Sequence, residues 1–180
     1  MGEREVDRSV HERAQVTVRP VHPDDAEGVA GILNPIIEAR SFTALDTPFS
    51  IEAERDFIHH FPTRGIFHVA VAGTHGPIVG FQNVEPFADY THAFDHVGVI
   101  GTYVDLSRRR QGIASQLFDA TFAAAPAKGY EKLFGFVRAD NLPALFTYLR
   151  HGFRAIGNAR KHARIDGRFV DEILIERLLT

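Results

Sequence analysis

The sequence predicts an α+β fold, in which a mixed and mostly antiparallel β-sheet lies between layers of helices in a single domain. Segments with the two-residue alternation of strands are interleaved with segments whose apolar residues recur at helical spacing. Residues 97–104 are apolar on both faces and lead through a helix into a second apolar strand, which is typical of a parallel βαβ unit. The chain closes with two alternating runs joined by Asp166-Gly167, which is a strong hairpin signal.

The composition is that of one globular domain, with 180 residues, 44% of them hydrophobic and 24% charged, and a net charge of −3. We expect a mobile leader over residues 1–15, which hold seven charged residues, and one domain over residues 16–180. The absence of cysteine excludes a disulfide scaffold, a thiolate zinc site and a cysteine nucleophile. The acidic balance disfavours binding to nucleic acid. Because there is neither an apolar run of about 20 residues nor a signal core, we expect a cytoplasmic protein that does not enter a membrane.

The first half of the chain is predicted to contain a strand, two helices and a β-hairpin. Residues 15–19 alternate as a short strand. A helix is expected from Pro23, because proline suits the first helical turn, and Pro35 inside its apolar stripe is expected to kink or split it. After a loop over residues 40–49, Ser50 is placed to cap a second helix. Its expected buried residues are Ile51, Phe57, Ile58 and Phe61, and strands at 66–72 and 78–84 follow, joined by the loop 73–77.

The second half is predicted to alternate central strands with helices and to end in a hairpin. The strands fall at 97–104 and 133–137, the helices at 111–125 and 141–150, and the hairpin at 161–165 and 168–178. Asn141 suits the N-cap of the second helix, and Gly152 suits the left-handed residue that ends it.

The most informative segment runs from Val97 to Ala114, where a strand enters a basic, glycine-containing loop that opens directly into a helix. A helix N-terminus presents unpaired N–H groups and a partial positive charge, so it binds phosphate. Gly112 permits close approach of a ligand to the backbone, and the arginines at 108–110 attract an anion. Neither the P-loop pattern nor the dinucleotide pattern is present. The alternative interpretation is a solvated basic turn before an ordinary helix.

Four motifs in this segment and elsewhere resemble those of the GCN5-related N-acetyltransferase (GNAT) family. Arg109-Arg-Gln-Gly-Ile-Ala114 matches the Arg/Gln-x-x-Gly-x-Gly/Ala signature of that family. The run from Asn141 through Tyr148 to Gly152-Phe153 resembles its second cofactor element, and the final hairpin and the stretch from Arg19 to Asp25 resemble its two ends. The resemblance covers about residues 16–178. The loop 34–48 and residues 102–104 look most like the phosphinothricin and methionine-sulfoximine acetyltransferase branch.

This resemblance implies a sheet that splays at its central strands and acetyl-CoA as co-substrate, with no metal. The pyrophosphate is expected on backbone amides from Arg110 to Ser115, and the pantetheine arm beside the strand at 102–104. An N–H near Tyr103 or Val104 is expected to polarise the thioester carbonyl. The cofactor-binding residues implied are Thr102, Tyr103, Val104, Arg109, Arg110, Gln111, Gly112, Ile113, Ala114, Ser115 and Asn141.

Tyr148 occupies the family position of the general acid that protonates the departing CoA thiolate. A phenol with a pKa of roughly 10 suits a thiolate of similar basicity. At 100° per residue it falls about 110° from the centre of the helix's apolar stripe, so we expect it on the flank of the helix rather than in the core. The stripe consists of Leu142, Leu145, Phe146 and Leu149. The alternative is a surface or packing tyrosine.

The general base is not evident. Relatives of the phosphinothricin type carry a glutamate on the central strand, where this chain has Val99. The candidate replacements are Glu85 and Glu38, followed by Asp95 and His96. Proton loss through water, or from an amine that is already neutral, needs no side-chain base.

The sequence therefore favours an acetyl-CoA-dependent N-acetyltransferase that acts on a primary amine of a small molecule, either an amino acid or an analogue. The alternatives are a protein N-terminal, lysine or polyamine acetyltransferase, and a catalytically inactive acyl-CoA sensor. By analogy with the branch we expect a homodimer. Four loop phenylalanines are interpreted either as an apolar lining of the acceptor site or as local packing: Phe42, Phe49, Phe87 and Phe94. The ten histidines show no metal-binding spacing.

Overall fold

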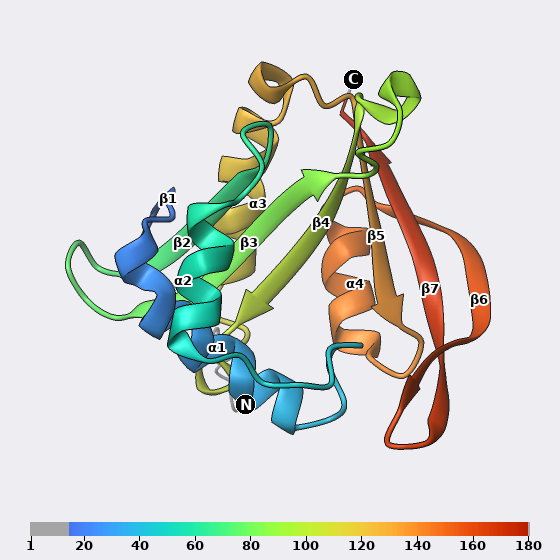
Figure 1. Cartoon of the computed structure of the whole chain (residues 1–180), viewed down its shortest axis with the longest axis horizontal. Coiled ribbons are helices and arrows are strands. Elements are labelled where there is room, and N and C mark those ends of the chain that lie inside the picture. The colour runs from blue at the N-terminus through green and yellow to red at the C-terminus, as the bar shows by residue number, and fades with distance from the viewer. Residues whose placement is uncertain (1–14, 180) are drawn as a thin grey trace, which may run out of the picture.

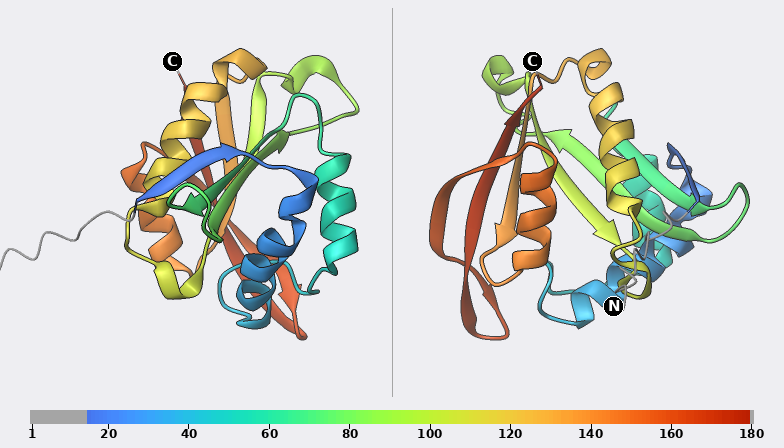
Figure 2. Two further views of the ribbon diagram at one scale, coloured as in Figure 1. Left: turned by 90° about the vertical axis from the view of Figure 1, so that its left-hand side faces the viewer. Right: turned by 180° about the vertical axis from the view of Figure 1, so that it is seen from behind.

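The computed structural model describes residues 15–179, so the expected leader lies outside the described residues except for Gln15. Its seven-stranded sheet has the order β1-β2-β3-β4-β5-β7-β6, and only β4 and β5 are parallel (Figure 1). The strands are β1 (Val16–Pro20), β2 (Ile66–Ala72), β3 (Ile78–Pro86), β4 (Val97–Val104), β5 (Lys132–Arg138), β6 (Arg154–Ile165) and β7 (Arg168–Leu178). The helices are α1 (Ala26–Glu38), α2 (Ile51–His59), α3 (Ile113–Ala124) and α4 (Leu142–Arg150). Helices α1 and α2 cover one face and α3 and α4 the other (Figure 2), which confirms the α/β/α sandwich.

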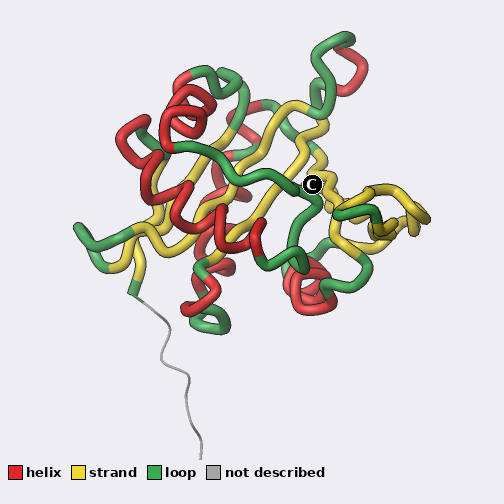
Figure 3. Tube along the Cα trace, turned by 60° about the horizontal axis from the view of Figure 1, so that its bottom comes forward, coloured by secondary structure: helices red, strands yellow, loops and turns green. Residues whose placement is uncertain are grey.

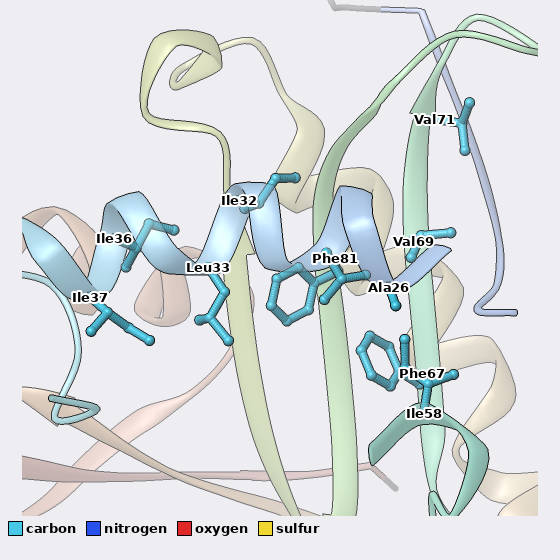
Figure 4. Close-up of a cluster of buried hydrophobic side chains, with 11 residues drawn as sticks. Ala26, Ile32, Leu33, Ile36, Ile37, Ile58, Phe67, Val69, Val71 and Phe81 are labelled. Atoms are coloured by element: carbon cyan, nitrogen blue, oxygen red, sulfur yellow. The ribbon is translucent and has the colours of Figure 1, made fainter. Parts of the chain in front are cut away.

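Helix α1 continues through Pro35 to Glu38, so the expected split does not occur. Apolar residues on both sides of the proline are buried, including Leu33, Ile36 and Ile37. They pack over the β2 and β3 side chains of the same core cluster (Figure 4). Burying each of these side chains stabilises the helix by about 1.5–3 kcal/mol, which is comparable to the roughly 3 kcal/mol that an interior proline costs.

Helix α2 begins as predicted, because the Ser50 hydroxyl accepts a hydrogen bond from the Ala53 N–H at 3.1 Å. The prediction of its buried face was partly wrong. Ile58 is buried, but Ile51 and Phe57 are 38% and 41% exposed. The helix lies in the outermost layer, and only the side that faces α1 and β2 is covered.

The parallel pairing of β4 with β5 is short, since it runs only from Val97–Lys132 to Val99–Phe134. Beyond these residues the two strands diverge (Figure 1). On its other side β4 stays paired with β3 as far as Val104. The splay expected at the central strands is therefore present, and it begins at Ile100.

The C-terminal strands form a twisted ribbon at one edge of the sheet (Figure 3). Asp166 and Gly167 both have positive φ, 47° and 78°, as the predicted two-residue turn requires. Gly152 also has a left-handed conformation (φ 81°) and ends α4 as predicted. Strand β6 begins earlier than predicted, at Arg154, because irregular register shifts interrupt its alternation.

Candidate active site

One cleft of about 1510 Å³ opens where β4 and β5 diverge. Its walls come from the loop after α1, the gap-side end of β4, the segment 106–115 and helix α4. All eleven residues predicted to bind the cofactor line it, as do Tyr148 and Glu85. Two distant parts of the sequence, residues 102–115 and 141–151, are therefore brought to one site by the parallel βαβ unit.

The N-terminus of α3 forms an anion cradle at one end of this cleft. Arg110 and Gly112 have left-handed backbone conformations, with φ of 61° and 78°. The first amide with a backbone acceptor is that of Gln116, which donates to the Gly112 carbonyl at 3.3 Å. Among the described residues, the amides at 110–115 have no hydrogen-bond acceptor. Such a row of free N–H groups at a helix start suits a phosphate or pyrophosphate.

The edge of β4 that faces the gap also carries free backbone groups. The Asp105 N–H donates to the Val79 carbonyl at 3.0 Å, and the antiparallel register with β3 is regular from there along the strand. Backbone pairing therefore alternates along β4. The N–H and C=O groups of odd-numbered residues point toward β3, and those of even-numbered residues point toward the gap. Of the two amides expected to polarise a thioester carbonyl, that of Val104 faces the gap, whereas that of Tyr103 faces β3.

Tyr148 lies at this open edge. Its hydroxyl donates to the Thr102 Oγ at 3.0 Å, and the same oxygen accepts a hydrogen bond from the Gln82 Nε2 at 2.8 Å. Burial raises the pKa of Tyr148, and the nearby Tyr103 adds to the rise. The phenol is therefore protonated throughout the physiological range. Neither Thr102 nor the fully buried Gln82 was recognised in the sequence as a partner of Tyr148.

The prediction that Tyr148 lies on the flank of α4 was wrong, because it is the only buried residue of that helix. The ring packs between Phe118 and Phe153, at centroid distances of 5.3 and 5.1 Å. Leu142 and Phe146, members of the predicted inward stripe, are 52% and 56% exposed. The splay explains the difference, since α4 covers the end of a gap rather than a continuous sheet.

Glu85 is the candidate base that the fold brings to the cleft. It is half-buried on β3 and directly opposite Val99, so both side chains project from the same face. The Asn83 amide donates to its carboxylate at 3.3 Å, and burial raises the pKa of Glu85. The carboxylate thus lies one strand away from Val99, the position at which the family resemblance led us to expect a glutamate. Glu38 is exposed at the end of α1 and does not line the cleft.

A buried arginine and asparagine fasten the loop after α1 over the cleft. Arg138 donates to the carbonyls of Arg40 and Thr43, at 2.8 and 3.3 Å. The Asn141 side chain caps α4 through its oxygen and donates its Nδ2 to the Phe42 carbonyl at 3.0 Å. Asn141 therefore holds the loop and the helix together. Arg138 was missed because its partners are backbone carbonyls about a hundred residues away.

His151 joins the end of α4 to the start of α3. Its Nδ1 donates to the Thr147 carbonyl at 2.8 Å, so its Nε2 accepts from the Ser115 hydroxyl at 3.1 Å. The imidazole also stacks on Phe118 at 4.3 Å. This contact braces the anion cradle against the helix that carries Tyr148.

Two negative findings concern the described residues alone. Between residues 15 and 179 no three histidines or carboxylates gather where they could hold a metal ion. No helix in that range is both long enough and apolar enough to cross a membrane. Of the four loop phenylalanines, Phe42 lines the cleft and carries the Arg109 guanidinium over its ring at 4.0 Å, whereas the other three do not line it.

Comparisons with known proteins concern the family and the fold of this chain. The model of the Acetyltransferase (GNAT) family matches residues 36–153. The chain is 26% identical over 166 residues to YwnH of Bacillus subtilis (strain 168), across 92% of this chain and 100% of YwnH. It is also 26% identical over 169 residues to the phosphinothricin N-acetyltransferase of Streptomyces coelicolor (strain ATCC BAA-471 / A3(2) / M145), across 92% of this chain and 98% of that protein. The structure of the phosphinothricin acetyltransferase of Sinorhizobium meliloti in complex with acetyl-CoA has the same fold, with a TM-score of 0.82 at 18% identity over 91% of this chain and 88% of that one.

Proposed function

This chain belongs to the acetyltransferase (GNAT) family, and from that membership we propose that it acetylates the primary amine of a small molecule, either an amino acid or an analogue. It is an N-acetyltransferase with acetyl-CoA as donor. The small-molecule acceptor is supported by the phosphinothricin N-acetyltransferase of Streptomyces coelicolor, to which the chain is similar over nearly its whole length.

The observation that carries the proposal is the convergence of three features in one cleft: the free amides at 110–115, the open edge of β4, and Tyr148. The amides suit the pyrophosphate of CoA. The N–H and C=O groups of Thr102 and Val104 suit the pantetheine amides, as an added strand would. Residues of all these features line the same cleft, so one CoA molecule can contact them together.

In the proposed reaction the amine nitrogen attacks the thioester carbonyl carbon, a new C–N bond forms, and the C–S bond breaks. The Val104 N–H stabilises the negative charge that develops on the carbonyl oxygen. Tyr148 gives its proton to the sulfur, and its own negative charge is relieved when a proton returns from solvent. The cleft lowers the barrier further by holding both reactants together.

The proton lost by the amine goes to Glu85 through water. Val99, the partner of Glu85, lies three residues along β4 from Thr102, which corresponds to about 10 Å of strand. Over such a distance a proton cannot pass directly from the amine to the Glu85 carboxylate, so at least one water molecule carries it. Glu85 lies on the α1 and α2 face, and Tyr148 on the α3 and α4 face, so amine and thiol occupy opposite sides of the gap.

We further propose that residues 16–180 form one acetyltransferase domain, and that the protein acts as a homodimer in the cytoplasm. An inactive acyl-CoA sensor is the main competing function, because no glutamate occupies position 99. The retained Tyr148, hydrogen-bonded at the open edge of β4, favours the enzyme.

The test combines calorimetric titration with acetyl-CoA and a thiol-release assay over amino acids, phosphinothricin, polyamines and peptides. The proposal expects binding of acetyl-CoA and turnover of at least one small amine. Binding without turnover of any acceptor identifies a sensor. Turnover confined to peptides or polyamines refutes the small-molecule assignment.

A further inference from the structure

An exposed row of aromatic side chains leads from the mouth of the cleft across the open half of the sheet. Ring centroids lie 5.1 Å apart for Phe94 and Phe87, 5.6 Å for Phe87 and Phe134, and 5.1 Å for Phe134 and Phe136. The His162 imidazole stacks on Phe136 at 5.9 Å. Phe94, Phe87 and Phe136 are 37%, 38% and 43% exposed. Together these five residues form the aromatic row.

The aromatic row lies on the same face of the sheet as Glu85. Phe87 follows Glu85 by two residues, and Phe134 is in register with Val99, the cross-strand partner of Glu85. The core beneath α1 and α2 draws its buried strand residues from β2 and β3, and these two helices do not extend over β5 and β7 (Figure 1).

Two carboxylates line the cleft together with the last residues of the aromatic row. Glu85, Glu172, Phe136 and His162 all line it. Glu172 is 7% exposed, and its Oε2 lies 3.8 Å from the His162 Nε2. Arg138 on β5 is the cross-strand partner of Glu172. Its guanidinium is already bound to the Asp140 carboxylate and to two loop carbonyls. This end of the cleft therefore attracts an ammonium group and offers little to a substrate carboxylate.

We propose that the preferred acceptor is a primary amine that carries an aromatic ring and no carboxylate. Its ring rests on Phe136 and Phe134, and its amino group lies between Glu85 and the gap beside β4. Aromatic rings prefer offset or edge-on contacts of the kind that these phenylalanines already make with one another. A carboxylate holds an ammonium more strongly when both are shielded from water. This inference rests on the proposed acetylation of a small primary amine, and within that reaction it favours an acceptor other than an amino acid.

A second copy of the chain is the competing occupant of these rings. The position of the carboxylates favours the amine, because Glu85 and Glu172 lie inside the cleft rather than around the rim of a flat interface. Phe136 and His162 also belong to the cleft and the row alike, so the two surfaces are continuous.

The test measures kcat/KM by thiol release for 2-phenylethylamine, butylamine, phenylalanine and phosphinothricin. We expect the value for 2-phenylethylamine to exceed each of the others by at least about tenfold. In Phe136→Ala, kcat/KM for 2-phenylethylamine should fall to the value for butylamine, so that the advantage of the aromatic amine disappears. Phe169→Ala is the matched control, because Phe169 is 57% exposed and packs near Lys161 and Arg164 outside the cleft. Sedimentation of each variant reports the oligomeric state.

Equal rates for all four amines, or a preference for an amino acid, overturn the aromatic-amine assignment but leave the transferase intact. A dimer that dissociates in Phe136→Ala with an equal loss for every amine identifies the row as a subunit interface and also overturns it. If acetyl-CoA binds and no amine is acetylated, the proposed function itself fails.

Discussion

Replacing Tyr148 by phenylalanine separates its chemical role from its packing role. The variant loses one hydrogen bond, from the hydroxyl to the Thr102 Oγ at 3.0 Å. Thr102 keeps its donor from Gln82 at 2.8 Å, so no buried acceptor is left unpaired. The ring contacts with Phe118 and Phe153 remain. We therefore expect a loss of about 1 kcal/mol in the free energy of unfolding, which lowers Tm by about 2–4 °C in a domain of this size.

The expected effect on turnover is much larger. A positioned general acid contributes about 10²–10⁴ to the rate, so kcat should fall by that factor. The KM for acetyl-CoA should change little, because the cradle at 110–115 does not involve the phenol. Since burial raises the pKa of Tyr148, the wild-type kcat should not decline on the alkaline side below about pH 10. Thiol release and thermal unfolding measure the two quantities.

Tyr130→Phe is the matched control. Tyr130 is 2% exposed in the same core cluster as Tyr148, and its hydroxyl has no hydrogen-bond partner among the described residues. We expect its kcat to equal that of the wild type and its Tm to be equal or slightly higher. If Tyr148→Phe keeps kcat within about threefold of the wild type, or if both variants lose activity equally, the acid assignment is refuted.

Three further substitutions test the base, the cradle and the fastened loop. In the wild type kcat/KM should rise with pH as Glu85 loses its proton, and because burial raises the pKa of Glu85, this rise should occur at a pH above the ordinary pKa of glutamate. In Glu85→Gln the rise should be lost. Because the pKa of Glu85 is higher in the folded state than in the unfolded state, its contribution to stability is complete below the unfolded-state pKa and is lost as pH rises through the folded-state pKa. At pH 8 the wild type therefore holds a buried charge that Glu85→Gln lacks, so the variant should have an equal or higher Tm. Gly112→Ala forces a side chain into a backbone with φ 78° and should cost about 1–2 kcal/mol and weaken acetyl-CoA binding in calorimetry by at least about tenfold. Asn141→Ala removes a helix cap and a loop contact, so it should cost about 1 kcal/mol and speed proteolysis of residues 40–49.

Each of these variants has a control in the same chain. Glu131→Gln alters an exposed glutamate outside the cleft and should change neither the pH profile nor Tm. Gly129→Ala also strains a left-handed residue (φ 81°) but should leave acetyl-CoA affinity intact, since Gly129 lies outside the cleft. Asn141→Asp keeps the cap acceptor and loses the donor to Phe42, so it should release the loop without the full loss of stability. If the paired variants behave alike, the corresponding role is wrong.

Much of the fold follows from local chemistry that the sequence carries by itself. The Ser50 and Asn141 caps, the turn at Asp166-Gly167 and the left-handed Gly152 each depend on a few neighbouring residues, and all four occur in the structure. The anion cradle is local in the same sense, because a strand, a basic loop and a helix start follow one another without interruption. For that reason the sequence alone indicates which residues form it, and the structure shows that these residues line one cleft.

Tertiary packing decided the rest. Helical spacing alone placed Tyr148 on a flank, but the diverging strands leave a gap that its ring fills, so it is buried while Phe146 is exposed. Val99 lacks a carboxylate, and only the register of β3 with β4 reveals that Glu85 stands directly beside it. The hold of Arg138 on the loop after α1 depends on contacts nearly a hundred residues apart. Spacing along a chain fixes what neighbours do to one another, whereas the meeting of distant side chains depends on which strands pair and where they part.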